Sequence, residues 1–91
     1  QGRWKEAEEL QAKELETCAK KLGQSHPDTL ISMRNLAFIW KDMGRHKDAL
    51  GLVQTCSDIQ QQVLGVDHPY AVSTLSALKA WREENKQPPG Q

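Results

Sequence analysis

The stretch Gly44–Ala49, with the sequence GRHKDA, repeats the stretch Gly2–Ala7, with the sequence GRWKEA, and every position is shifted by the same amount along the chain. The same shift relates Leu10 to Leu52, Leu22-Gly23 to Leu64-Gly65, His26-Pro27 to His68-Pro69, and Leu36 to Leu78. Agreement at separate patches in one register is the signature of a repeat architecture. The chain is therefore two copies of one unit, residues 2–43 and 44–85, followed by a tail at 86–91 whose Pro-Pro cannot continue a helix.

Each unit contains two helical segments, because apolar residues recur every three to four positions and glycine or proline interrupts the pattern between the runs. In chain order the apolar stripes are Trp4, Ala7, Leu10, Leu15, Cys18 and Leu22; Leu30, Met33, Leu36, Ala37 and Trp40; Ala49, Leu52, Val53, Cys56, Ile59 and Val63; and Val72, Leu75 and Leu78. We predict helices over residues 3–22, 27–43, 46–64 and 69–85, joined by short turns. No stretch alternates with a period of two, so the predicted fold class is all-α, with antiparallel helix pairs.

The recurring His-Pro step predicts a helix start and no chemistry. Proline suits the first turn of a helix, and Ser25 or Asp28 is placed to receive its free N–H groups. No Ser, Cys or carboxylate stands at a spacing that would complete a nucleophile–base pair with His26 or His68. No Gly-rich phosphate loop ending in Lys-Ser occurs either. The sequence therefore predicts a protein that is not an enzyme, with no catalytic residue and no cofactor.

Size and charge narrow the class of partner. The 91 residues are one domain or a piece cut from a longer chain. Twelve Lys and Arg balance twelve Asp and Glu, so no charge excess favours nucleic acid or an anionic membrane surface. The longest apolar run, Leu36–Trp40, is far too short to span a bilayer. We expect neither nucleic acid nor membrane as a partner.

The two cysteines, Cys18 and Cys56, form no C-x-x-C pair, and the three histidines stand at no metal-ligand spacing, so no metal site is expected. Both cysteines have apolar neighbours at helical spacing, where a reduced Cys packs as a small hydrophobic residue. We expect buried free thiols, with a disulfide as the alternative. Free thiols favour an intracellular, cytoplasmic setting.

Two segments carry a family resemblance. The pattern Asn35-Leu36-Ala37-x-x-Trp40-x-x-x-Gly44-Arg45-x-x-x-Ala49 and the junction Val63–Pro69 resemble the 42-residue tetratricopeptide repeat of kinesin light chains. Similar repeats occur in arrays attached to fungal NB-ARC or NACHT-type NTPases. The resemblance covers about residues 2–78, and the Leu-Gly-x-x-His-Pro junction is its most specific part.

The resemblance implies a right-handed solenoid of stacked helix pairs that is not enzymatic and binds short peptide segments of other proteins. The helix after His-Pro, about residues 28–43, is then an inner helix that lines a concave groove. The helix after Gly-Arg, about residues 46–64, lies outside. By this phasing residues 3–22 form an outer helix without its inner partner, and the chain resembles one end of a longer array of neighbouring repeats.

The second helix carries a narrower apolar stripe opposite its core stripe. Ile31 and Phe38 lie on this arc, and they either touch the neighbouring inner helix or provide apolar contacts for a bound peptide. If the stripe binds a peptide, Arg34 or Lys41 pairs with an acidic group of that peptide. The resemblance implies that Asn35 holds the main chain of the peptide. The candidate peptide-binding residues are Ile31, Arg34, Asn35, Phe38, Lys41 and Asp42.

The fourth helix departs from its counterpart toward polar residues. Lys79 replaces Ala37, and Arg82 replaces Trp40. Because a repeat array needs a polar terminal unit, we predict that residues 69–85 form a C-terminal cap. Trp81 aligns with Ile39 rather than Trp40, which either shifts the packing register or provides a contact for another molecule.

The leading functional hypothesis is a protein-interaction scaffold that presents a concave helical groove to a peptide or partner domain. The alternative is a structural cap or self-association segment of a longer array that regulates an attached NTPase. In that alternative, the stripe of Trp4, Leu10 and Leu15 is buried in a homodimer.

Overall fold

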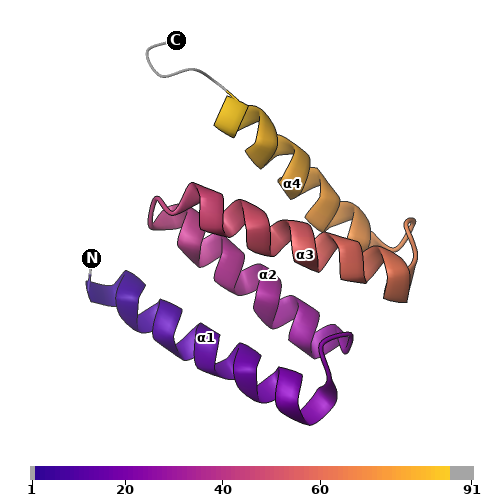
Figure 1. The fold of residues 1–91 in the computed structure, drawn as a ribbon, viewed down its shortest axis with the longest axis horizontal. Helices are drawn as coiled ribbons and strands as arrows, with labels where there is room; N and C mark the ends of the chain where they lie inside the picture. Colours follow the sequence, from indigo (N-terminus) through magenta and orange to yellow (C-terminus); the bar gives the residue numbers. More distant parts are fainter. Residues whose placement is uncertain (1, 87–91) are drawn as a thin grey trace.

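The computed structural model describes residues 2–86, which form four helices (Figure 1). Helix α1 spans Gly2–Leu22, α2 spans Pro27–Asp42, α3 spans His46–Leu64 and α4 spans Pro69–Lys86. No strand occurs between residues 2 and 86, so the all-α fold class is confirmed. Every helix bound lies at or next to its predicted position. Of the predicted tail, Lys86 is the last residue of α4, and residues 87–91 lie outside the described residues.

The helices follow one another in chain order, and each packs against the next (Figure 1). Helix α3 contacts both α2 and α4, while α1 packs against α2. The principal-axis extents are 44 × 35 × 16 Å, so the four-helix stack is thin in one direction. The three turns reverse the chain at Gly23, Gly44 and Gly65, whose φ angles are +94°, +89° and +95°. Only glycine adopts such left-handed values without strain, which explains where each helix ends.

The core consists of two clusters that join all four helices. One cluster connects α2, α3 and α4 through Ala37, Ala49, Val53, Leu78 and Trp81. The other contains Leu30, Met33 and Cys56, with Leu15 of α1 packed against it. The apolar register predicted for α2 is therefore confirmed, since Trp40 packs on the first cluster while Ile31 remains 37% exposed.

Several members of the predicted apolar stripes are exposed instead of packed. They are Trp4, Leu10, Leu22, Val63 and Val72. Helices α1 and α4 each have a packing neighbour on one side only, so the part of a stripe that faces away from that neighbour meets solvent. On α4 the buried residues are Ala71, Thr74, Leu78 and Trp81, which places Trp81 in the core and Val72 outside it.

Each His-Pro step caps the helix that follows it. The Nδ1 atom of His26 accepts a hydrogen bond from the Asp28 N–H at 3.1 Å, and Nδ1 of His68 accepts one from the Tyr70 N–H at 3.1 Å. The predicted role of both histidines at the helix start is confirmed. The capping role expected for Ser25 or Asp28 is wrong for α2, because the imidazole occupies the N-cap position and accepts the free N–H itself.

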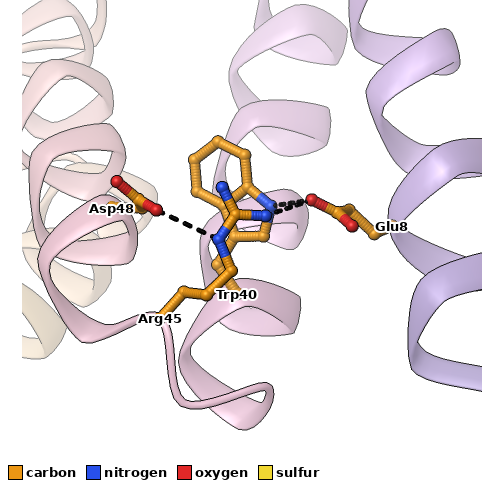
Figure 2. Close-up of polar contacts among 4 residues, drawn as sticks. All are labelled: Glu8, Trp40, Arg45 and Asp48. Atoms are coloured by element: carbon orange, nitrogen blue, oxygen red, sulfur yellow. Dashed lines mark hydrogen bonds and ion pairs between the residues drawn. The ribbon is translucent and has the colours of Figure 1, made fainter. Parts of the chain in front are cut away.

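A polar cluster fastens α1 to the α2–α3 hairpin (Figure 2). Nε1 of Trp40 donates to a carboxylate oxygen of Glu8 at 2.7 Å, and the Arg45 guanidinium pairs with the same oxygen. Arg45 also donates to Asp48 at 3.0 Å and stacks 4.6 Å from the centre of the Trp40 ring. Hydrogen bonding to Asp48 and then to Glu8 raises the pKa of Arg45 above its ordinary value. Four side chains from three segments therefore fix how α1 lies against the hairpin.

Both cysteines are free thiols. Cys56 is buried as predicted, whereas Cys18 is only half-buried, because it faces Ser32 near the edge of the α1–α2 contact, with 4.0 Å between Sγ and Oγ. None of the four helices in the described part of the chain has the length and apolarity that crossing a lipid bilayer requires.

Candidate functional site

The six predicted peptide-binding residues lie along the face of α2 that does not enter the core. Ile31 and Phe38 are 37% and 38% exposed, although both are large apolar residues. Asn35 and Asp42 are exposed, while Arg34 and Lys41 are half-buried. We call these six residues the α2 face. Because α2 lies between α1 and the α3–α4 pair, the two edges of this face meet different neighbours.

Three residues of the α2 face contact α4. The ring of Phe38 packs edge-on against Trp81 with 5.0 Å between ring centres. Arg34 lies over the Phe38 ring, with its guanidinium carbon 4.9 Å from the ring centre, and donates to the Ser73 hydroxyl at 2.9 Å. Of the two alternatives for Phe38, the contact with the next helix that follows a His-Pro step is therefore present, and it leaves over a third of the side chain exposed.

Lys41 completes this edge of the α2 face. Its Nζ atom lies 3.2 Å from a carboxylate oxygen of Glu84 and 5.5 Å from the centre of the Trp81 ring. Beside it, Lys41, His46, Trp81 and Glu84 line a pocket of about 110 Å³. We call this pocket the Lys41 pocket. It brings residues from α2, α3 and α4 to one place.

The other edge of the α2 face lies beside α1. Ile31 and Asn35 line a shallow hollow of about 180 Å³, which is completed by Glu14, Cys18, Asp28 and Ser32. The structure therefore divides the predicted residues between two places. Arg34, Phe38 and Lys41 lie at the α4 edge, and Ile31 and Asn35 lie at the α1 edge. Asp42 is exposed at the end of α2 and lines neither hollow.

The two edges differ in charge, which decides what each can bind. The hollow at the α1 edge is lined by two carboxylates, Glu14 and Asp28, and by no Lys or Arg among the described residues. The α4 edge carries two cations, Arg34 and Lys41, beside the aromatic rings of Phe38 and Trp81. A cation beside an apolar or aromatic surface suits a carboxylate with an apolar neighbour. With Arg34 and Lys41 against the carboxylate of Glu84, the α4 edge therefore has a net positive charge beside two aromatic rings, whereas the α1 edge is negative.

Sequence reasoning missed three residues of this edge, His46, Ser73 and Glu84, and named Trp81 only as a register shift or a contact for another molecule. In the sequence, Ser73 and Trp81 stand out only as departures from the first repeat. Their contacts with α2 depend on how two helices that are adjacent in space but not in sequence cross each other. The position of Trp81, one place out of register with Trp40, is the signal that the sequence offers.

The described residues contain no cluster of three or more His, Cys, Asp or Glu side chains that could hold a metal ion. Burial raises the pKa of the Cys56 thiol to about 11, with the nearby positive charge of Arg34 offsetting part of the effect. A thiol that remains protonated is a poor nucleophile, so Cys56 is a packing residue.

The structure consists of stacked antiparallel helices built from two copies of one unit. A comparison with protein families gives a matching result. The family model of the tetratricopeptide repeat matches residues 1–52, which is more than half of the chain. The chain belongs to the tetratricopeptide repeat family. This membership supports a general role in protein interaction, because tetratricopeptide repeats are generally scaffolds without enzymatic activity.

Relatives match along nearly the whole chain at low identity. The clustered mitochondria protein homolog of Culex quinquefasciatus is 29% identical over 87 residues, which is 96% of this chain and 6% of that protein. Tetratricopeptide repeat protein 19, mitochondrial, of Rattus norvegicus is 28% identical over 82 residues, which is 90% of this chain and 22% of that protein. The chain thus spans less than a quarter of the length of either relative, and neither name denotes an enzyme.

Proposed function

We propose that this tetratricopeptide repeat segment binds a peptide along the α2 face, and that the peptide carries an acidic side chain next to an apolar one. The exposed Phe38, which contacts both Arg34 and Trp81, carries the proposal. A large ring that already contacts a cation and a second aromatic ring is ordered, so little side-chain entropy is lost when a partner covers it.

The sequence supports a finer assignment to the 42-residue type found in kinesin light chains. The two His-Pro caps recur at that spacing, as do the glycine turns at Gly23 and Gly65, and both features end or begin helices in the structure. We infer that α2 and α4 are inner helices and α1 and α3 outer ones. Asn35, exposed on the α2 face, is then placed to hold the main chain of a peptide.

The test is a binding screen on an array of acetylated, amidated nonapeptides that carry two Glu and two apolar residues. We expect Phe38→Ala to weaken the best binder at least tenfold, since a central aromatic anchor provides a large share of the binding free energy. Val63→Ala is the matched control, because Val63 is an exposed apolar residue on α3 away from the α2 face. Equal affinity of the two variants, with equal helicity by circular dichroism, would overturn the proposal.

A second candidate is a structural role at one end of a longer array. The exposed Trp4 and Leu10 of α1 favour it, since an apolar stripe that no other helix of the described residues covers suits contact with a neighbouring repeat or a second copy. The polar Lys79 and Arg82 of α4 favour a C-terminal cap. In this alternative the segment forms a homodimer through α1, or it stabilises neighbouring repeats that regulate an attached NTPase. A molar mass by light scattering that stays monomeric at all concentrations would exclude the homodimer.

A further inference from the structure

The Lys41 pocket already holds a carboxylate from the protein itself. Glu84, in the last turns of α4, places its carboxylate oxygen 3.2 Å from Nζ of Lys41. The indole of Trp81, which is only 9% exposed, forms one wall, and His46 at the start of α3 forms another. The pocket is thus built from three helices around one cation.

The ion pair inside the pocket is easily exchanged. The side chains of Lys41 and Glu84 are 26% and 59% exposed, and ion pairs that are this open to water contribute little to stability. Trp81, in contrast, belongs to the core cluster and holds its place without Glu84. A rotation of the Glu84 side chain therefore leaves a formed pocket with one cation, one imidazole and an aromatic wall.

We propose that the Lys41 pocket is the carboxylate-binding end of the α2 face, and that Glu84 occupies it as an internal competitor which an acidic side chain of the peptide displaces. The inference rests on the proposed function, because it names a subsite of the same groove. It also adds a role for α4: the predicted capping helix sets how tightly an acidic peptide binds.

Charge favours a carboxylate over a basic group as the occupant. Once Glu84 moves out, the remaining pocket residues carry no negative charge. Arg34 lies on the same edge of α2 and adds a second positive charge along the path of the peptide. The observed Lys41–Glu84 contact shows that a carboxylate fits the pocket sterically.

The experiment compares Glu84→Gln with Glu83→Gln, which removes the same charge from an exposed neighbour that does not line the pocket. The probes are the best acidic nonapeptide from the array and its counterpart with both Glu replaced by Gln. Both peptides are acetylated and amidated, so their only carboxylates are side chains. We expect Glu84→Gln to tighten the acidic peptide about two- to fivefold, as expected for removing a weak competing ion pair. Glu83→Gln should change this affinity less, and the neutral peptide should bind all three proteins alike.

Two results separate this inference from the proposed function. Binding of the acidic peptide with equal affinity to the wild-type protein, Glu84→Gln and Glu83→Gln would overturn the role of Glu84 and leave the groove intact. No binding of any array peptide to any of the three proteins, with normal helicity, would overturn the groove itself. Lys41→Gln should abolish the preference for the acidic over the neutral peptide, and a preference that persists would also contradict the pocket assignment.

Discussion

His26 and His68 take a position at which Ser, Thr, Asp or Asn is usual, and they do the same work with a ring nitrogen. Each imidazole Nδ1 accepts one N–H of the first helical turn, and the following proline has no N–H that needs an acceptor. The pair therefore reduces the number of N–H groups left without an acceptor at the helix start. The recurrence of His-Pro in both repeats is therefore explained by backbone hydrogen bonding without a catalytic role.

Cys56 gives a prediction at the residue scale. Its thiol is buried and donates to the Leu30 carbonyl with 3.4 Å between Sγ and O, which requires the protonated form. Its pKa is about 11 in the folded protein against an ordinary value of 9.0. The folded state therefore holds the proton more tightly, and this stabilisation is complete below pH 9 and is lost as the pH rises from about 9 toward 11.

We expect the free energy of unfolding to fall by up to roughly 2–3 kcal/mol over this interval because of Cys56 alone. Urea unfolding of the wild-type protein and of Cys56→Ala at a series of pH values measures this fall, since the difference between the two stability curves isolates the contribution of Cys56. The variant should be less stable at about pH 8 and should show the shallower decline. Parallel curves for the two proteins would show that burial does not perturb the thiol.

At the scale of helices, the polar cluster of Glu8, Trp40, Arg45 and Asp48 joins α1 to the α2–α3 hairpin, in addition to the apolar core clusters (Figure 2). One oxygen of Glu8 accepts from the Trp40 indole at 2.7 Å and from Arg45, so the removal of one carboxylate frees two donors. The corresponding position one repeat later is Leu50, which packs against the core cluster around Trp81. At this repeat position the first unit thus makes a charged contact and the second an apolar one.

We predict that Glu8→Ala lowers the free energy of unfolding by about 1–2 kcal/mol, mainly through the half-buried Trp40 N–H that loses its charged acceptor. Hydrogen exchange should become faster in α1 before it does in α3, because α1 then keeps only the long hydrogen bond from Gln11 to the Ser32 carbonyl and the weak Cys18–Ser32 contact as polar links to α2 in the described residues. Glu9→Ala is the control, since Glu9 is the next residue of the same helix and is exposed. Equal exchange rates in α1 for the two variants would contradict the conclusion that the polar cluster holds α1 in place.

The helices themselves could be predicted because their ends depend on local chemistry. The glycine turns, the His-Pro steps and the apolar period each act over a short stretch of chain, so the bounds and the α2 register followed from the sequence. The α4 register followed only in part. Leu75 and Leu78 pack on the core cluster as predicted, whereas Val72 is exposed and Ala71 and Thr74 are buried instead. Buried polar residues such as Ser57, Gln60 and Thr74 hide this contact face from a hydrophobic pattern.

The candidate site was only partly predictable for the same reason. Which residues of α2 face away from the core was clear from its period, and Ile31 and Phe38 are indeed exposed. The division of the α2 face into an acidic edge and a basic, aromatic edge was not, because it depends on Glu14 of α1 and on Trp81 and Glu84 of α4. Side chains from helices that are distant in sequence decide the charge of each edge, and a single sequence does not specify their crossing.

At the scale of the whole molecule, the two repeats have the same sequence pattern in unequal surroundings. Leu10 and Leu52 occupy equivalent positions of the two repeats. Leu52 of α3 packs on both core clusters, whereas Leu10 of α1 is 70% exposed. Stability in stacked repeats comes mainly from contacts between nearest neighbours, so the same side chain contributes differently at the end and in the middle of a stack.

We therefore predict that Leu52→Ala lowers the free energy of unfolding by about 2–4 kcal/mol, as expected for truncation of a packed leucine. Leu10→Ala should change it by less than about 0.5 kcal/mol, in line with an exposed site. Urea unfolding of both variants at several protein concentrations gives the comparison, with molar mass measured in parallel. A large, concentration-dependent loss for Leu10→Ala would mean that a second copy covers the α1 stripe, and it would favour the self-association role over an isolated groove. Equal small losses for both variants would instead show that the α2–α3 pair is not the stable centre of the stack.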